Sequence, residues 1–251
     1  MKIAIAGGTG TVGRHVVRAA HERGHDVVVL SRKQKVDVLG DVGIARSIEG
    51  ADAVIDVLNT TTLSTGAARA FFSTATSNLL AAEGQVGTAH HITLSIVGID
   101  DIDTSYYAGK IAQERLVHAS DVPHTVARTA QFHEFAEQVA SQTTIGPVTV
   151  VPRTLTRPVA ARDVADHLVR VAETEPAGRA PDLVGPQDAT LADMVRRMYE
   201  HDGSRRRVLD VRFPGAYGRG LASGALRGGP DGQSVTETTF DQWLESADHR
   251  G

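Results

Sequence analysis

Three glycines near the N-terminus have the spacing of a phosphate-binding turn. Gly7, Gly10 and Gly13 follow an apolar stretch and precede a segment whose apolar residues recur at helical spacing. Glycine lets the backbone turn tightly and approach a ligand where a Cβ atom would collide. A helix that starts at such a turn offers unpaired N–H groups and a positive dipole end to an anion. We therefore expect a dinucleotide diphosphate to contact Gly7, Thr9, Gly10, Thr11, Val12 and Gly13.

The residues after the second apolar stretch indicate which dinucleotide is preferred. An acidic residue here would bond the ribose 2′-hydroxyl of NAD, but Leu30 is followed by Ser31, Arg32 and Lys33. A guanidinium matches the charge and geometry of a phosphate, so we expect Ser31 and Arg32 to favour NADP(H) over NAD(H). Lys33 is equally well explained as part of a solvated basic turn. Further along the chain, we expect Asp41 and Val42 beside the adenine ring and Asn59 near the nicotinamide half.

A tyrosine and a lysine four residues apart could perform proton chemistry. Tyr106 and Lys110 lie in a predicted helix, where this spacing places both side chains on one face. Hydride transfer to a carbonyl needs a proton donor, and a nearby cation makes a phenol a better one. Ser95, at the end of a predicted strand, could polarise the substrate oxygen. These three residues are the predicted catalytic group, with Lys110 also contacting the cofactor.

The elements that must position these residues alternate between strands and helices. We expect strands at 3–6, 27–30, 36–38, 53–58, 92–97 and 124–128. Helical periodicity occupies 12–20, 67–82 and 106–119. Continuous apolar strands such as 27–30 are typical of strands buried on both faces. The alternation predicts an α/β fold of the Rossmann type, with a doubly wound parallel sheet.

The rhythm changes after residue 128. A strand-like piece at 147–152, a helix at 164–172 and a strand at 183–184 are followed by two helices that start near Thr190 and Thr239. Thr239 and Gln242 match a capping box, and Trp243 is expected in the core. The segment 215–232 holds seven glycines and is expected to be mobile. We interpret residues 1–251 as one domain in which about 130–251 form most of a small substrate lobe.

Composition narrows the classes of function. The chain has 251 residues, a formal net charge of −4 and no cysteine, which argues against nucleic-acid binding and excludes disulfides and thiolate metal sites. No apolar run approaches the ~18 residues of a membrane span, and no signal-peptide pattern is visible, so we expect a cytoplasmic protein. His90 and His91 would alternate faces on a strand, so no metal site is expected. A homodimer is compatible with the sequence.

Several motifs together resemble one superfamily. They are Gly7-Gly8-Thr9-Gly10-Thr11-Val12-Gly13, Leu94-Ser95-Ile96-Val97-Gly98-Ile99, Tyr106-Tyr107-Ala108-Gly109-Lys110, Arg128-Thr129-Ala130-Gln131-Phe132-His133, Arg162-Asp163-Val164-Ala165 and Leu183-Val184-Gly185-Pro186. Over nearly its full length the chain resembles the atypical, NmrA-like branch of the short-chain dehydrogenase/reductase superfamily. The resemblance implies NADP(H) binding and, in active members, Tyr106 as proton donor and Lys110 orienting the ribose. Some members lack the tyrosine and act as cofactor-sensing regulators.

The residues after the sixth predicted strand are expected to line the substrate side. Gln131, Phe132 and His133 are the predicted substrate-binding residues, and His133 is either a pocket residue or a second acid–base group. Arg128 is expected to pair with Asp163 or to meet a substrate anion.

Three functions remain open at this point. The first is an NADPH-dependent reductase of a carbonyl, quinone or enone of a small apolar metabolite, with Tyr107 as the alternative donor. The second is a non-catalytic NADP(H) sensor that binds a regulatory partner. The third, a sugar-nucleotide epimerase or dehydratase, fits less well because those enzymes usually need a larger C-terminal domain.

Overall fold

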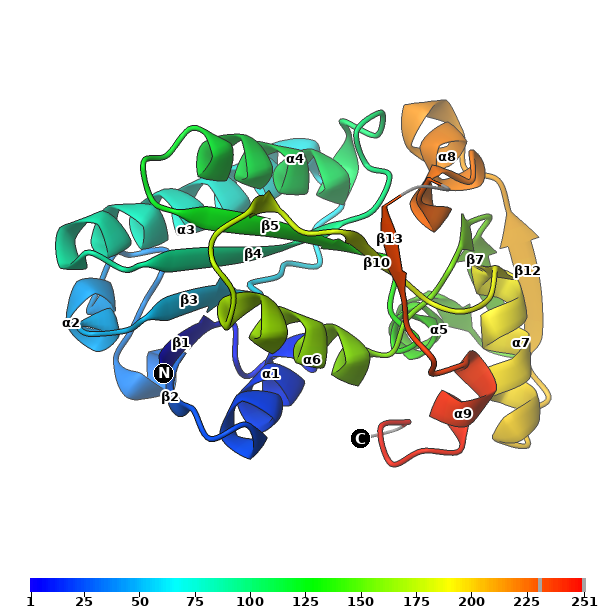
Figure 1. Cartoon of the computed structure of the whole chain (residues 1–251). Coiled ribbons are helices and arrows are strands. Elements are labelled where there is room, and N and C mark those ends of the chain that lie inside the picture. The colour runs from blue at the N-terminus through cyan, green and yellow to red at the C-terminus, as the bar shows by residue number, and fades with distance from the viewer. Residues whose placement is uncertain (230–231, 250–251) are drawn as a thin grey trace. The chain divides into compact units, whose positions relative to one another are not determined.

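The computed structural model describes residues 1–229 and 232–249 (Figure 1). The chain divides into two compact units. Unit 1 comprises Met1–Ser95, Asp103–Arg128 and Val164–Ala180, and unit 2 comprises Ile96–Ile102, Thr129–Asp163 and Pro181–Gly251. Within the described residues, no helix is long and apolar enough to cross a membrane.

Unit 1 contains most of a parallel sheet with helices on both faces. Its elements are β1 (Lys2–Ala6), α1 (Thr11–Glu22), β2 (Asp26–Leu30), η1 (Arg32–Gln34), α2 (Ile44–Ile48), β3 (Ala53–Asp56), α3 (Thr65–Val86), β4 (His90–Ile96), α4 (Ser105–His118), β5 (His124–Thr129), α6 (Ala161–Ala172) and β9 (Gly178–Arg179). In the strand order β2-β1-β3-β4-β5, the strand that follows β1 along the chain lies on one side of it and the later strands lie on the other side. This arrangement is that of a doubly wound sheet. Helices α3 and α4 cover one face, and α1 and α6 cover the other (Figure 1).

Burial explains why β1 and β3 are almost continuously apolar. Residues 3–6 of β1 and all of β3 are buried, because each strand has a neighbour on either side and helices on both faces. The interior side chains of β1 pack against α2 and α3, including Ile48 and Leu79. The parallel α/β architecture predicted from the sequence is therefore confirmed.

Residues 36–38 do not form the strand that the sequence predicts. A single antiparallel bridge joins Asp37 to Val42, and Asp41 has the left-handed φ of 51°. Val36 and Val38 are nevertheless buried in the core of unit 1. These residues are apolar because their side chains enter the core from a turn. The left-handed Asp41 closes that turn, so the segment does not pair as a strand of the sheet.

Unit 2 contains a pair of parallel strands and two smaller sheets. Its elements are α5 (Phe135–Thr143), β6 (Thr144–Ile145), β7 (Val148–Pro152), β8 (Leu155–Thr156), β10 (Asp182–Val184), β11 (Ala189–Thr190), α7 (Leu191–His201), β12 (Arg207–Val211), α8 (Gly215–Ala222), η2 (Ala225–Arg227), β13 (Gln233–Val235) and α9 (Phe240–Leu244). Leu183 of β10 pairs with Thr129, the last residue of β5, and β13 pairs with β10. The large sheet has eight strands, of which seven follow the order β13-β10-β5-β4-β3-β1-β2 and the eighth, β9, pairs with β5 off this path.

Helix caps in unit 2 follow the sequence predictions. The Thr190 hydroxyl caps α7 by accepting a bond from Asp193 N, and Thr239 and Gln242 form the predicted capping box of α9. Trp243 is fully buried in the core of this unit, also as predicted. Most of the glycine-rich segment forms α8 and η2, whereas residues 230–231 lie outside the described part of the chain.

Candidate functional site

The glycine turn after β1 is too tight to accept side chains at two positions. Gly7 has φ 85°, and a Cβ atom there would lie 2.8 Å from the carbonyl oxygen of Val57. A Cβ atom on Gly13 would lie only 2.0 Å from the carbonyl oxygen of Gly7. The Gly10 amide donates to that same oxygen at 2.9 Å. The turn therefore brings the first residues of α1 next to the end of β1.

The tip of this turn is exposed. Thr9, Gly10 and Thr11 are exposed, whereas Val12 and Gly13 are buried against the sheet. The N-cap residue of α1 is Gly10, and no side chain caps the helix. The first N–H groups of a helix have no partner within the helix, so this end suits an anion such as a diphosphate.

The segment after β2 carries the predicted adenosine side. Ser31 is half-buried, and Arg32 is exposed in the short η1 helix. Asp41 and Val42 lie in the turn described above and are also exposed. Asn78 of α3 fixes this turn by donating to the carbonyl oxygens of Val38 and Leu39, at 2.8 and 3.2 Å. The region thus presents the cation of Arg32 on η1 and the exposed side chain of Val42 on the turn that Asn78 holds.

A buried chain of polar groups, here called the lysine chain, consists of Lys110, Gln113 and Asp56. The Lys110 ammonium donates to Gln113 Oε1 at 2.5 Å, and Gln113 Nε2 donates to Asp56 Oδ2 at 2.7 Å. All three residues are buried, and Asp56 also accepts the Leu58 amide at 2.9 Å. The amide of Gln113 therefore connects the cation of α4 to the carboxylate at the end of β3.

The environment of Lys110 sets its charge. Burial lowers the pKa of Lys110 to about 8, while the carboxylates of Asp56 and Glu114 act in the opposite direction. The ammonium also lies 4.6 Å from the ring centroid of Phe72, a cation–π distance. Lys110 is thus a buried cation whose charge is sensitive to pH just above neutrality.

The predicted proton donor lies beside Asn59. Tyr106 is half-buried, and its hydroxyl donates to Asn59 Oδ1 at 2.7 Å. Burial, and secondarily the negative charge of Asp56, raises the pKa of Tyr106. Tyr107 packs edge-on against Tyr106 with ring centroids 5.8 Å apart, and it is buried, with 4% of its surface exposed. Of the two tyrosines, Tyr106 is therefore the more accessible one.

The direct coupling expected between Tyr106 and Lys110 is not the arrangement found. Among the residues that the structure describes, Lys110 makes its one hydrogen bond with Gln113, not with Tyr106. The pKa of Tyr106 is accordingly raised by burial, rather than lowered by the ammonium as expected. Gln113 and Asp56 were not predicted as site residues from the sequence. Their only signal was a glutamine three residues after Lys110 and an acid at the end of an apolar strand.

The start of α4 is held in an unusual conformation. Ser105 has a φ of 54°, which is uncommon for a residue other than glycine. Its amide donates to Thr65 Oγ1 at 2.8 Å, and its hydroxyl donates to the Leu63 carbonyl at 2.9 Å. Such strain persists only where the surroundings enforce it. The start of α3 thus fixes the residue that immediately precedes Tyr106.

Ser95 has a buried hydroxyl without a protein partner. It lies in β4 with 1% of its surface exposed, and among the described residues no group bonds to its Oγ. An unsatisfied buried hydroxyl costs about 1–3 kcal/mol, so it needs an explanation. The predicted contact of Ser95 with a substrate oxygen stays a prediction, because the structure buries this hydroxyl from solvent.

Arg128 forms a structural ion pair with an unexpected partner. Its Nε and Nη2 donate to the two carboxylate oxygens of Glu114 at 2.8 and 2.6 Å, and both side chains are buried. Glu114 was not predicted from the sequence, and the pairing of Arg128 with Asp163 or with a substrate anion stays a prediction. The pair joins β5 to α4, because Glu114 is one helical turn after Lys110 and faces the sheet.

The predicted substrate-binding residues belong to unit 2. Gln131 and Phe132 are half-buried, and the amide of Val159 donates to the Gln131 carbonyl at 3.0 Å. His133 is 1% exposed, and its Nε2 lies 3.2 Å from the Thr238 carbonyl. Burial lowers the pKa of His133 to about 4, so the ring is neutral at physiological pH. These features favour a packed role for His133 over a second acid–base group.

His90 and His91 point to different partners. His90 Nε2 lies 2.8 Å from Thr125 Oγ1, and His91 Nδ1 lies 2.8 Å from Glu83 Oε1. The alternation expected of neighbouring residues on a strand explains this divergence.

Comparison with known proteins identifies the kind of ligand that such a site takes. The model of a family described as NAD(P)H-binding matches residues 7–175, which include the glycine turn, the lysine chain and Tyr106. No curated protein matches the chain.

Solved structures share the fold at low sequence identity. An NADPH-dependent quinone oxidoreductase from Escherichia coli, complexed with NADPH, matches with a TM-score of 0.76 and 15% identity, covering 97% of this chain and 98% of the other. A dTDP-4-dehydrorhamnose reductase from Clostridium acetobutylicum matches with a TM-score of 0.72 and 16% identity, covering 98% of both chains. A nucleoside-diphosphate-sugar epimerase from Staphylococcus aureus matches with a TM-score of 0.70 and 17% identity, covering 98% of this chain and 100% of the other.

Proposed function

The chain belongs to the NAD(P)H-binding family, and we propose that it is a reductase that uses NADPH to reduce a carbonyl, quinone or enone of a small apolar metabolite. The observation that carries the proposal is the half-buried phenol of Tyr106, oriented by Asn59 on the helix that also carries Lys110. A positioned hydroxyl of this kind is the group that a reductase needs in order to protonate a developing alkoxide.

The residues of unit 1 fit such a cofactor. The glycine turn has the tight backbone and the exposed helix start that a diphosphate requires. Arg32 would bind the 2′-phosphate that distinguishes NADP(H) from NAD(H), since no acid stands in its place. When bound, NADPH supplies a hydride to the substrate carbon.

The chain's own groups handle the proton and the oxygen. Tyr106 donates its phenolic proton to the substrate oxygen and regains a proton from solvent. Its raised pKa keeps the phenol protonated near neutrality, and an alkoxide is a strong enough base to take that proton. The orphaned hydroxyl of Ser95 donates to the same oxygen. Lys110, held by Gln113, would contribute its positive charge to cofactor binding rather than to Tyr106.

The test is turnover with a matched pair of tyrosine variants. NADPH consumption is followed by absorbance with a panel of quinones, enones and aldehydes. Tyr106→Phe should lower kcat by about 10²- to 10⁴-fold without weakening NADPH binding, because general-acid catalysis contributes on this scale. Tyr107→Phe, on the neighbouring buried ring, should retain most of the rate. Equal rates for the wild type and Tyr106→Phe would contradict the proposed role.

A non-catalytic NADP(H) sensor is the second candidate. It is favoured by one observation: the Tyr106 hydroxyl and the Lys110 ammonium are each already bonded to an amide oxygen of the protein. For a sensor we expect tight NADPH binding and no turnover of any compound in the panel. The Tyr106→Phe variant of a sensor should bind NADPH with the same affinity as the wild type.

A further inference from the structure

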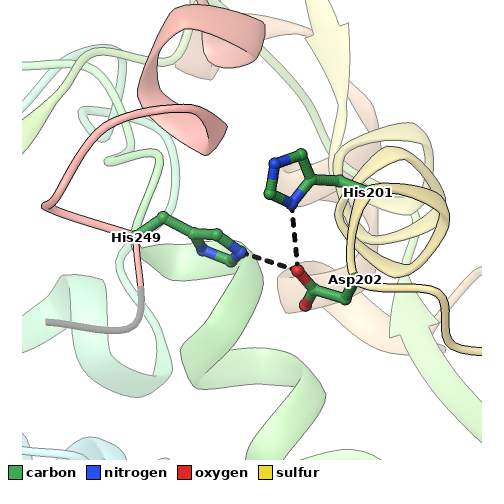
Figure 2. A group of neighbouring side chains, drawn as sticks. All are labelled: His201, Asp202 and His249. Carbon is green, nitrogen blue, oxygen red and sulfur yellow. Dashed lines mark hydrogen bonds and ion pairs between the residues drawn. The ribbon is translucent and has the colours of Figure 1, made fainter.

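Two histidines and an aspartate come together at the end of α7. His201 is the last residue of α7, Asp202 is its C-cap, and His249 follows α9. Figure 2 shows both imidazoles pointing at the same carboxylate oxygen. His201 Nδ1 lies 3.1 Å from Asp202 Oδ1, and His249 Nε2 lies 2.9 Å from it. We call these three residues the histidine cluster.

The spacing of the cluster is close to that of a metal site. With metal–ligand bonds of about 2.0–2.1 Å, the ligand atoms of a tetrahedral Zn²⁺ site lie about 3.4 Å apart. The two measured separations are a few tenths of an ångström shorter, and the three ligand atoms all lie within 4.8 Å of one another. An ion could therefore enter after small rotations of the side chains.

A fourth residue orients His249 from behind. His249 Nδ1 lies 2.5 Å from Glu137 Oε1 of α5, while its Nε2 faces the cluster. Histidines that bind metals usually give their other ring nitrogen to a carboxylate, which fixes the ring and strengthens the ligand. The His249 side chain is 5% exposed, so its orientation is well determined by packing.

The opposite side of the cluster is open. The side chain of His201 is 40% exposed, compared with 13% for Asp202. An ion can therefore reach the cluster from solvent, and a water molecule can complete its coordination. Two imidazoles and one carboxylate are ligands that Zn²⁺ and similar late first-row cations accept.

We propose that His201, Asp202 and His249 form a binding site for a divalent cation of the Zn²⁺ type, with Glu137 as the positioning residue of His249. The ion would join the segment after α9 to the end of α7, both in unit 2. The proposal is independent of the reductase activity, because none of these residues is assigned to that reaction.

Calorimetry with Zn²⁺ tests the site in the full chain, prepared without a polyhistidine tag and freed of metal with a chelator. We expect one Zn²⁺ per chain. His201→Ala removes an exposed ligand, so it should fold normally and should weaken binding at least 10-fold. Glu137→Gln should weaken binding by about 10- to 100-fold. Absence of Zn²⁺ binding at about 1 mM, or unchanged affinity in His201→Ala, would overturn the proposal.

A second histidine pair provides the matched control. His118 Nδ1 and His124 Nε2 lie 3.1 Å apart in unit 1 and are the natural competing surface site. His118→Ala should leave Zn²⁺ affinity unchanged. Binding that is lost in His118→Ala and kept in His201→Ala would refute the assignment.

The only tryptophan gives a readout that is local to the site. The Trp243 ring centroid lies 5.0 Å from that of His249. Ni²⁺, a paramagnetic ion that imidazoles bind well, should therefore quench Trp243 fluorescence in the wild type and in His118→Ala. Quenching that persists unchanged in His201→Ala would contradict binding at the histidine cluster.

Discussion

The lysine chain of unit 1 and the histidine cluster of unit 2 arrange polar side chains in opposite ways. In the lysine chain the neutral amide of Gln113 separates the cation from the carboxylate, and every member is buried. In the histidine cluster the imidazoles meet one carboxylate oxygen directly, and His201 is open to solvent.

This difference in burial and in the spacing of the charged groups indicates which ligand suits each arrangement. The Lys110 ammonium is separated from the Asp56 carboxylate by the amide of Gln113. Its positive charge is therefore only partly neutralised and can still attract a nearby anionic ligand. Ring nitrogens directed at one carboxylate oxygen can, as proposed above, take up a small cation after small rotations of the side chains. The comparison can be tested by measuring NADPH and Zn²⁺ affinities on the same variants.

The largest effect is expected when the glycine turn is filled. Gly13→Ala places a Cβ atom 2.0 Å from the Gly7 carbonyl oxygen, so the turn must open. We expect NADPH affinity, measured by calorimetry, to fall at least 100-fold, equivalent to about 2.7 kcal/mol or more. Zn²⁺ affinity should be unchanged.

Gly84→Ala is the matched control for that substitution. Gly84 is also helical, but a Cβ atom there meets nothing within 4 Å. Alanine should preserve NADPH binding and stabilise α3 by up to about 1 kcal/mol. Equal losses in both variants would show that the turn is not the determinant.

A smaller, cofactor-specific effect is expected at Arg32. Arg32→Glu should weaken NADPH binding by about 10- to 100-fold, because it replaces the cation that we propose faces the 2′-phosphate with an anion, and should weaken NADH binding much less. Arg46→Glu, an exposed arginine of α2, is the control. Equal losses for both nucleotides in Arg32→Glu would refute the assignment of Arg32.

The lysine chain should be visible in the pH dependence of turnover. The pKa of Lys110 is about 8, and the negative charge of Asp56 raises it against the effect of burial. Activity that needs the cation is present below this pKa and is lost as pH rises through it. Asp56→Asn should therefore move the alkaline limb of kcat/KM to lower pH. The exposed carboxylate variant Asp52→Asn should not, and an unmoved limb in Asp56→Asn would disprove the coupling.

The last effect concerns the pH dependence of stability in unit 2. Glu134 accepts bonds from Trp243 Nε1 at 3.0 Å and from the Ala161 amide, and burial raises its pKa to about 7. Its protonated form stabilises the fold at low pH, and this contribution is lost as pH rises through 7. Glu134→Gln keeps an acceptor without the charge.

Urea unfolding at pH 5.5 and 8 measures this contribution. The wild type should lose about 1–3 kcal/mol more than Glu134→Gln between these pH values. Glu200→Gln, an exposed acid of α7, should follow the wild type. Identical pH dependence in wild type and Glu134→Gln would contradict the interpretation.

Much of the framework could be read from the sequence, because its signals are local. The turn at Gly7 and Gly13, the alternation of strands and helices, and the caps at Thr190 and Thr239 depend on backbone conformation and on periodicity within a few residues. The same spacing rules placed Tyr106 and Lys110 on one helix. The strand expected at 36–38 failed because apolar residues can also be buried from a turn.

Only the tertiary structure decided which side chains meet. Gln113 lies 57 residues from Asp56, and His249 lies 47 residues from Asp202, so no local pattern records either contact. The partner of Arg128 likewise depends on how α4 packs on β5. Backbone conformation is fixed by near neighbours in sequence, whereas the charge and hydrogen bonding of a buried group are fixed by whatever the fold brings against it.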